Sequence, residues 1–506
     1  MESTSSEAQV TQSGQAIAIN NICCSQLAEL FGPMFGPNGS VKALLSGGQQ
    51  LNLTKDGNSL CKDIQFTHPT SILITRTASS LYNSNGDGTI AFILLACECF
   101  KEAYKYYCEG TSLPLVINSL QLALKDVSEL IQNSAVPLSD KTLRQLVFTS
   151  LSTKVRNPGF LVDIVLKAMA SLNRSFDTNM IEILKMEEGD IADSIFVDGL
   201  VLDHGGRHYT MPTHVENVCV LTANMSLEYE KPEVNAEFCY SSAQQREQLA
   251  LSEREFIAEK AKKIADLANT LKREGKALVL INEKGIDPYS LEILANAGVL
   301  ALRRAKRRNL ERLVNMCGGK LVTQVSQLCK ENLGFCQKVT VKTINENKYT
   351  FIEGTPLKGS CTILLRGDSD YERISRSIKG TVNSLAIAIQ TKCCIYGGID
   401  LYKSIITTLN EKMQNVHHSD AVGYKILSRA FEGLIKTLLR NDDKNINEEL
   451  VRLFRENEPD QNVVENIKVV NSCITNAVIT TINLLMCDEI ILAGKSINQG
   501  SKGTEQ

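Results

Sequence analysis

The 506-residue sequence has no tryptophan, only 6 histidines and an aromatic content of 6%. It has no apolar run near the roughly 20 residues that a membrane-spanning helix needs, and no basic patch that leads into an apolar stretch at the N-terminus. Its 16 cysteines include no Cys-x-x-Cys pair and none with a histidine at metal-ligand spacing. We therefore expect no membrane segment, no secretory signal and no structural metal, and a soluble cytosolic protein with reduced cysteines.

An excess of one charge is also missing. The 54 basic residues nearly balance the 57 acidic ones, for a net charge of −3, so no global field favours nucleic acid or an anionic membrane as a partner. Hydrophobic residues make up 43% of the chain and charged residues 22%, which suits folded cores rather than disorder. By length, about three or four folding units are expected.

The pattern of apolar residues changes along the chain. Short apolar runs bounded by turns predict buried strands in the middle, and Asp287-Pro288 and Gly298 are typical of the start and end of a helix between two of them. Apolar residues at three- and four-residue spacing predict helices at both ends. The sequence thus favours a multidomain α/β protein, in which an inserted α/β domain separates two mainly helical flanks that fold together. The predicted strands are 218–221, 277–281 and 299–302, and the clearest predicted helices are 15–31, 69–82, 89–108, 114–132, 421–439 and 463–485.

Three glycine-containing loops lie in the first ninety residues. Residues 35–42 could form an ordinary turn, and Asp56-Gly57 within 54–58 is typical of a hairpin turn. Residues 86–89, Gly-Asp-Gly-Thr, stand directly before a long apolar helix, where backbone N–H groups can bind phosphate and an aspartate can hold Mg²⁺. Together the loops offer a phosphate site, a metal ligand and a second carboxylate, as phosphoryl transfer to water requires.

The order and spacing of these loops, with His68-Pro69-Thr70 between them, resembles the nucleotide-binding loops of group II chaperonins. Residues 201–208, 285–288 and 301–309 are similar to one subunit type of the eukaryotic cytosolic members. The resemblance covers residues 15–498. It implies a mainly helical equatorial ATP-binding domain, an intermediate hinge domain and an apical substrate-binding domain. These are expected at 1–145 with 396–506, at 146–207 with 361–395, and at 208–360.

The resemblance also implies a role for individual residues. Asp87 would bind Mg²⁺ and Asp56 would help to position the attacking water. ATP would be held by residues that match the family's nucleotide-binding positions: Gly36, Pro37, Gly88, Thr89, Ile90, Thr153, Lys154, Gly397, Gly398 and Glu465.

Three positions depart from the family's pattern. Ile90 replaces a threonine, so one phosphate-binding hydroxyl is missing, and the glycine-rich segment 396–400 is shortened. The motif that normally supplies a catalytic aspartate reads Val-Asn-Ser-Leu at 382–385, so Asn383 or Ser384 stands where an acid is expected. Losing a positioned general base typically costs about 10²- to 10⁴-fold in rate. We expect weakened hydrolysis, unless a local shift brings in another carboxylate, and whether this chain is itself an ATPase stays open.

A basic stretch follows the last predicted strand, with an apolar stripe on the other face of its helix. It could simply be a solvated face, and nucleic-acid binding is disfavoured because no aromatic residues interleave with the charges. In chaperonins this helix borders the apical substrate groove, so polar, acidic segments of unfolded client proteins are the expected ligand. Residues 240–264 match the helical protrusion that serves as a lid. The basic stretch contains Arg303, Arg304, Lys306, Arg307, Arg308 and Arg312, and the first two arginines with Arg307 and Arg308 are the predicted client contacts.

The resemblance implies an ATP-binding, Mg²⁺-dependent subunit of a hetero-oligomeric folding chaperone. Its partners would be other chaperonin subunits in an eight-membered double ring and unfolded clients, in the cytoplasm. The alternative is a chaperonin-derived scaffold that no longer handles nucleotide, and a metabolic kinase is a distant third. The intact Asp56, Asp87, Gly88 and Lys154 favour the first interpretation, because a pure scaffold needs no Mg²⁺–phosphate pocket.

Overall fold

The computed structural model divides the chain into two compact units, each described here by itself. The first, which we call the helical unit, contains Met1–Val162 and Glu372–Gln506, and the second, the sheet unit, contains Asp163–Tyr371. The predicted multidomain α/β fold class is confirmed, and along the chain the sheet unit lies between the two segments of the helical unit. The segments predicted as an intermediate domain are divided between the units, and the three-domain division stays a prediction. The residues described are 9–11, 14–45, 51–172, 177–186, 189–228, 243–367, 371–455 and 462–492.

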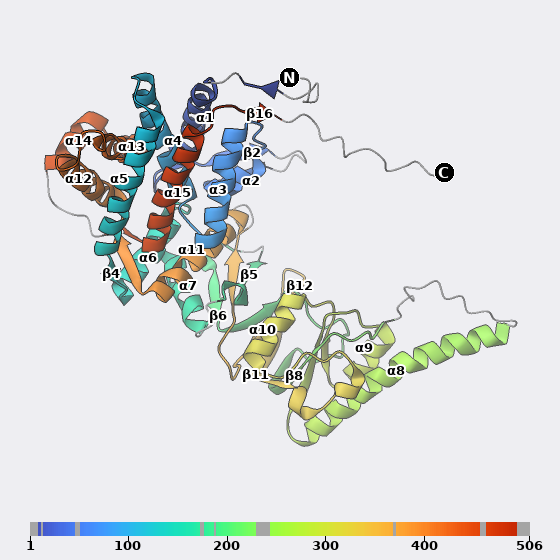
Figure 1. The fold of residues 1–506 in the computed structure, drawn as a ribbon. Coiled ribbons are helices and arrows are strands. Elements are labelled where there is room, and N and C mark those ends of the chain that lie inside the picture. The colour runs from blue at the N-terminus through green and yellow to red at the C-terminus, as the bar shows by residue number, and fades with distance from the viewer. Residues whose placement is uncertain are drawn as a thin grey trace, which may run out of the picture. The chain divides into compact units, whose positions relative to one another are not determined.

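The helical unit is built around α4 (Thr89–Cys108). Its buried residues, among them Phe92, Leu94 and Phe100, point to more than one side, as expected for a helix surrounded by others. Helices α1, α3, α13 and α15 pack against it, and Figure 1 shows α15 running beside α3 although the two are far apart in sequence. The other helices here are α1 (Ala16–Phe31), η1 (Gly32–Met34), α2 (Gly57–Asp63), α3 (Pro69–Asn85), α5 (Leu113–Asn133), α6 (Asp140–Ser152), α11 (Tyr371–Thr391), α12 (Gly398–Met413), α13 (Ala421–Asn441), α14 (Ile446–Arg455) and α15 (Ile467–Leu485).

Short strands complete the helical unit. Strand β1 (Gln9–Val10) pairs antiparallel with β16 (Ile491–Leu492), so the two ends of the described chain lie side by side. Strands β2 (Lys42–Leu45) and β3 (Leu51–Thr54) form an antiparallel pair, and β14 (Cys393–Tyr396) lies between β15 (Val464–Glu465) and β4 (Val136–Pro137). The prediction of helix from 463 is wrong for its first four residues, because 464 and 465 extend this sheet and the Asn466 side chain caps α15 by accepting from Lys468 N.

The sheet unit contains a six-stranded sheet in the order β10-β9-β8-β11-β12-β7. Strands β8, β9 and β10 are parallel, and β8, β11, β12 and β7 are joined antiparallel. The three apolar runs predicted as strands coincide with parts of β8, β9 and β10, except that Val299 precedes β10, and all their side chains but that of Ala277 are buried. The bounds are β7 (Gly199–Leu202), β8 (His214–Ala223), β9 (Ala277–Asn282), β10 (Leu300–Leu302), β11 (Gly334–Ile344) and β12 (Asn347–Glu353), and a second sheet pairs β13 (Cys361–Arg366) with β5 (Ile181–Met186) and β6 (Ile195–Val197).

The helices of the sheet unit are α8 (Ala243–Arg273), α9 (Pro288–Asn296) and α10 (Arg307–Cys317), with one-turn helices η3 (Thr178–Met180), η4 (Ile191–Asp193), η5 (Val325–Gln327) and η6 (Lys330–Asn332). The helix predicted at 240–264 is present as the longer α8, and residues 240–242 lie outside the described part. Asp287 caps α9 as predicted, because its carboxylate accepts from Tyr289 N. Helix α7 (Gly159–Ser171) crosses from one unit to the other. Within the described ranges, no helix has the length and apolar character needed to cross a bilayer.

Candidate nucleotide site

The loop that carries Asp87 is held between four helices. Helix α3 ends at Gly86 and α4 begins after Gly88, and both glycines have positive φ, +77° and +88°. A Cβ on Gly86 would lie 2.4 Å from the Gly380 oxygen of α11, and one on Gly88 would lie 2.4 Å from Cys473 Sγ of α15. Only glycine fits at either position, so the sequence Gly-Asp-Gly places Asp87 where α3, α4, α11 and α15 meet.

Both carboxylate oxygens of Asp87 have partners. Oδ1 accepts from the Gly88 N–H at 3.0 Å and lies 3.1 Å from Lys154 Nζ, while Oδ2 accepts from Ser150 Oγ at 2.7 Å. Burial disfavours the charge on Lys154, but the carboxylates of Asp87 and Asp56 outweigh burial and raise the pKa of the ammonium group. The site therefore contains a lysine whose charged form is favoured by two carboxylates.

Asp56 caps α2 instead of forming the predicted hairpin turn. Its Oδ2 accepts from the backbone N–H of Ser59 at 3.2 Å and from Ser59 Oγ at 2.9 Å. The prediction of a turn is wrong because an Asp three residues before a serine also suits a helix N-terminus, where it satisfies N–H groups that lack helical partners. The result is a buried carboxylate, 6% exposed, whose charge acts on Lys154.

The predicted phosphate loop at Gly36 and Pro37 is tied to the same place. Gly36 has a φ of +86°, and a Cβ there would lie 2.6 Å from Leu438 Cδ2 of α13. The Pro37 carbonyl accepts from Lys55 Nζ at 2.7 Å, and Lys55 directly precedes Asp56. Burial, followed by the charges of Arg156 and Arg373, lowers the pKa of Lys55 to about 8.

Of the predicted ribose-side residues, Glu465 lies on β15, and Gly397 and Gly398 lie at the start of α12, directly after β14. Glu465 Oε1 accepts from the Gly398 N–H at 3.0 Å, and a Cβ on Gly397 would lie 2.5 Å from the Glu465 carboxyl carbon. Burial raises the pKa of Glu465, the Gly398 hydrogen bond opposes the shift, and the Asp87 carboxylate adds to it. The structure thus brings this segment within electrostatic range of Asp87.

The remaining nucleotide residues differ in what they offer. Thr89 is buried at the start of α4, and Ile90 packs on Gly57, where a Cβ would lie 2.6 Å from Ile90 Cγ1. Thr153 Oγ1 donates to the Ser150 carbonyl of its own helix at 3.0 Å. Ile90 therefore fills, with apolar atoms, the space between the Asp56 loop and the first turn of α4.

Helix α11 presents no acid to the Asp87 loop. Its one carboxylate, Glu372, is 64% exposed and pairs with Arg376 at 2.7 Å. Gly380 and Asn383 pack against Gly86, and the Ser384 carbonyl accepts from Asn466 Nδ2 at 2.7 Å. The surface that these residues of α11 present to the loop offers amide, hydroxyl and backbone groups, and the loss of the general base stays a prediction.

The residues present fit a magnesium nucleotide. Two buried polar atoms on the segments around Asp56 and Asp87 make no hydrogen bond within the described residues, Asn58 Oδ1 and Asn85 Nδ2. Lys154 Nζ has its ion pair with Asp87. No described cluster of three His, Cys, Asp or Glu side chains could hold a metal alone. Asp87 would therefore supply one ligand, and phosphate oxygens and water the others, which is the usual arrangement for Mg²⁺.

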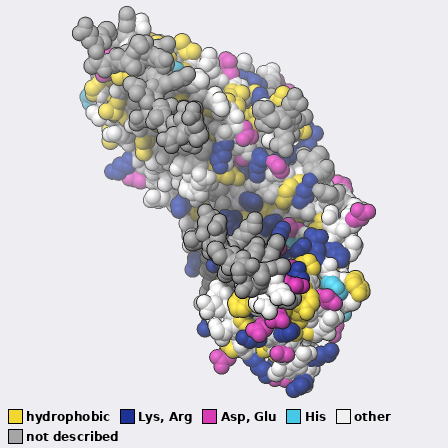
Figure 2. Space-filling view, turned by 90° about the vertical axis from the view of Figure 1, so that its right-hand side faces the viewer, with side chains coloured by type: hydrophobic (Ala, Val, Ile, Leu, Met, Phe, Trp, Pro, Cys, Tyr) yellow, Lys and Arg dark blue, Asp and Glu magenta, His cyan; other side chains and the backbone are white. Residues whose placement is uncertain are grey.

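The basic stretch of the sheet unit is largely neutralised by local acids. Arg304 pairs with Glu228 at 3.6 Å, and Arg307 pairs with both Glu283 and Glu311 at 3.3 Å. On the face drawn in Figure 2, basic and acidic side chains are interspersed rather than segregated. The solvated basic face is thus partly an ion-pair network.

Two arginines of this stretch have structural contacts. Arg312 does not belong to the solvated face: it is 4% exposed, pairs with Glu182 and donates to the Asn179 carbonyl. This corrects the sequence prediction, which could not see a partner 130 residues away. Arg303 Nη1 donates to the Ile286 carbonyl at 3.3 Å. Arg308 is exposed.

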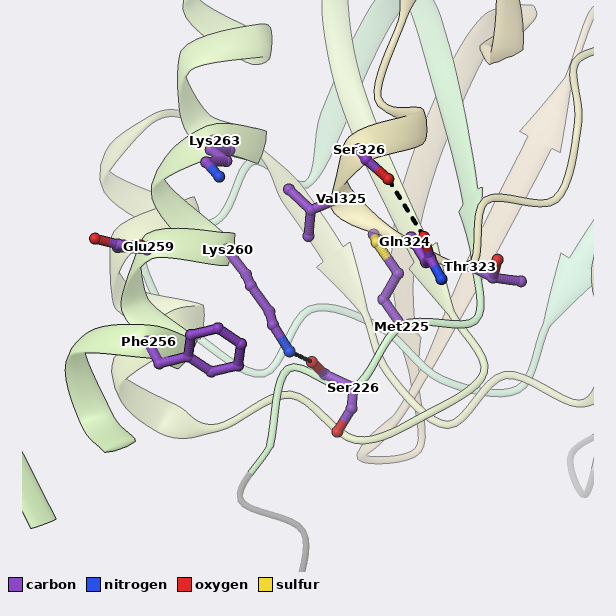
Figure 3. A pocket seen from close by; sticks show the side chains of 10 residues that line it. All are labelled: Met225, Ser226, Phe256, Glu259, Lys260, Lys263, Thr323, Gln324, Val325 and Ser326. Carbon is purple, nitrogen blue, oxygen red and sulfur yellow. Dashed lines mark hydrogen bonds between the residues drawn. The ribbon is translucent and has the colours of Figure 1, made fainter. Parts of the chain in front are cut away.

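The sequence did not point to the exposed aromatic residues of the sheet unit. Tyr209, 91% exposed, stacks on His208 with ring centroids 4.6 Å apart, and Tyr289 of α9 is 55% exposed. A cavity of about 290 Å³ lies between α8 and η5, where Lys260 donates to the Ser226 carbonyl and lies over the ring of Phe256 (Figure 3).

A helical unit that carries the Asp87 loop and is interrupted along the chain by a sheet unit is typical of a chaperonin subunit. The chain belongs to the TCP-1/cpn60 chaperonin family, whose model matches residues 27–495. It is 32% identical over 524 residues to T-complex protein 1 subunit zeta-2 of Homo sapiens, covering 98% of this chain and 99% of that protein. It is also 32% identical over 517 residues to the Mus musculus protein of the same name, covering 97% of each. The predicted family, and within it the resemblance to the zeta subunit of the eukaryotic cytosolic chaperonin TRiC, are confirmed.

Proposed function

We propose that this chain is an ATP-binding subunit of a hetero-oligomeric, double-ring cytosolic chaperonin, and that it hydrolyses ATP slowly. The observation that carries the proposal is the gathering of Asp56, Asp87 and Lys154 from three separate segments around one point. Taking these charges out of water costs free energy that their mutual attraction only partly returns. A binding site for a charged ligand accounts for the presence of such a cluster.

In this proposal each segment has one task. Asp87 would hold Mg²⁺, which neutralises phosphate charge when bound. The backbone at Gly36, Gly88 and Thr89 would bind the phosphates, and Lys154 would exchange its ion pair with Asp87 for one with the γ-phosphate. Gly397, Gly398 and Glu465 would line the ribose side, where the raised pKa of Glu465 suits a hydroxyl partner.

Slow hydrolysis is expected because α11 offers the site no carboxylate that could act as general base. An amide or a hydroxyl can orient a water molecule but cannot accept its proton at neutral pH, and Asn383 and Ser384 offer only these groups. Asp56 is engaged by Ser59 through Oδ2 and can contribute some water positioning. We therefore expect slow turnover with retained binding, because phosphoryl transfer depends on positioning as well as on the base.

The proposed partners are other chaperonin subunits and unfolded clients. The names of both relatives describe a subunit. Among the residues described, β1 with β16 and β2 with β3 form two-stranded sheets, whose edges a neighbour's strand could extend. Ring size, the client contacts at Arg303, Arg304, Arg307 and Arg308, and the cytoplasmic location belong to the proposal.

The alternative is a scaffold that binds no nucleotide, favoured by the departures at Ile90 and on α11. Photolabelling of the native complex with Mg-azido-ATP separates the two, with label counted on this chain. The proposal predicts label on the unmodified chain and at least a tenfold loss in Asp87→Asn. Asp126→Asn is the matched control, because Asp126 also pairs with a lysine, Lys412 at 2.8 Å. Asp126 lies on α5, which carries none of the proposed nucleotide residues, and Lys412 lies at the opposite end of α12 from Gly398. An unlabelled chain in an otherwise labelled complex would establish the scaffold.

A further inference from the structure

Helix α11 reaches Asp87 through two hydroxyl groups. Thr381 Oγ1 lies 3.0 Å from Ser150 Oγ, and Ser150 Oγ lies 2.7 Å from Asp87 Oδ2. Ser150 has one hydroxyl proton, and it donates this proton in its hydrogen bond to the ionised carboxylate of Asp87. Thr381 must therefore be the donor in its hydrogen bond to Ser150 Oγ. Thr381 is fully buried at 0% exposed. Both hydroxyl groups therefore point in one direction, from α11 to the carboxylate.

The same helix reaches Asp56 by a second path of the same design. Arg376 Nη1 lies 3.2 Å from Ser59 Oγ, and Ser59 Oγ lies 2.9 Å from Asp56 Oδ2. The Ser59 hydroxyl again donates its one proton to the carboxylate, so the Arg376 guanidinium donates to the serine oxygen. Each carboxylate of the site is thus joined to α11 through one serine, from positions five residues apart in the helix.

We propose that Thr381 and Arg376 are positioning residues, through which α11 sets the orientation of Asp87 and Asp56 toward a magnesium nucleotide. The proposal rests on the nucleotide binding proposed above. The Thr381–Ser150 path holds Oδ2 of Asp87, while Gly88 and Lys154 hold Oδ1, so the orientation in which the carboxylate would meet a metal depends on α11. Helix α11, which brings no carboxylate to the loop, contributes by holding two carboxylates that other segments carry.

The test is the Mg²⁺ dependence of azido-ATP labelling of this chain in its native complex. Ser150→Ala should raise the Mg²⁺ concentration for half-labelling about tenfold, the usual effect of losing a partner of a metal ligand. Thr381→Val should raise this Mg²⁺ concentration about threefold, since Thr381 is one hydrogen bond further from Asp87 than Ser150 is. Thr381→Ser keeps the hydroxyl group and should give the value of the unmodified chain. The double variant of Ser150→Ala with Thr381→Val should match Ser150→Ala alone, because the two residues act in series.

Ser377→Ala is the matched control. Ser377 is 1% exposed on the same helix, but its hydroxyl donates to the Arg373 carbonyl of α11 itself. This variant should leave the Mg²⁺ dependence unchanged. Arg376→Met should also leave it unchanged while lowering residual single-site turnover several-fold, because Asp56 positions water rather than metal.

Three results would overturn the inference. One is a Thr381→Val titration that coincides with the unmodified chain. Another is equal loss of labelling with and without Mg²⁺, which indicates general damage to the fold. The third is a shift in the Arg376→Met titration as large as that of Thr381→Val. An unmodified chain that takes no label at any Mg²⁺ concentration refutes the nucleotide binding itself, a different outcome.

Discussion

Replacing Gly86 by alanine should break the contact between the Asp87 loop and α11. Gly86 has a φ of +77°, and a Cβ there would lie 2.4 Å from the Gly380 oxygen and 2.8 Å from Asn383 Cβ. The left-handed backbone costs an L-residue about 1–2 kcal/mol. Because the nearest atoms are backbone on a packed helix, overpacking adds about 1–3 kcal/mol. We expect Gly86→Ala to destabilise the helical unit by about 2–5 kcal/mol.

Gly110→Ala supplies the control for backbone strain. Gly110 follows α4 with a φ of +91°, but no heavy atom lies within 4 Å of a Cβ there, so only the cost of about 1–2 kcal/mol for the left-handed backbone applies. The sequence has no tryptophan, so the assay is urea-dependent hydrogen exchange of α4 amides, which reports the helical unit alone. Equal destabilisation by the two variants would refute the close approach of α11 to the loop.

Three further predictions follow from named groups. The pKa of Lys55 falls from 10.5 to about 8 on folding. The charged side chain therefore destabilises the fold, and this effect reaches its full size below about pH 8. Lys55→Met should therefore raise the urea midpoint at pH 7, with a gain that vanishes toward pH 10.5, and a pH-independent gain would contradict this. Asn383→Asp or Ser384→Asp should increase single-site hydrolysis in the assembled complex by up to about 10²-fold, and no gain from either would place the missing base elsewhere. Arg307→Glu with Arg308→Glu should weaken capture of an acidic client, more at low salt than at high, without changing azido-ATP labelling; unchanged capture would count against these client contacts.

Local signals in the sequence predicted the framework of the site. Glycines around Asp87 and the apolar period of the following helix fix the α3–α4 loop, and both signals lie within a few residues of what they determine. The hairpin turn predicted at Asp56-Gly57 is wrong because the same residues suit both a tight turn and a helix N-cap. Which of the two forms depends on Ser59 and on packing.

Contacts between distant segments could not be predicted in this way. Arg312 lies beside the apolar stripe of α10, and its burial depends on Glu182, 130 residues earlier. Thr381 and Ser150 are 231 residues apart. Each lies close to residues predicted for the nucleotide site, but no local pattern shows that their hydroxyl groups pair with each other. Such pairs appear only when the fold brings α6, α11 and the Asp87 loop together.

The central claim is that this subunit binds a magnesium nucleotide at Asp87 and turns it over slowly. The most direct measurement is the nucleotide found in this chain's pocket after the native complex has been incubated with Mg-ATP, without a transition-state analogue, until the other subunits hold ADP. The account predicts density for intact ATP, with Mg²⁺ on Asp87 and the γ-phosphate at Lys154. An empty pocket would contradict the binding, and ADP formed as fast as in the other subunits would contradict slow hydrolysis.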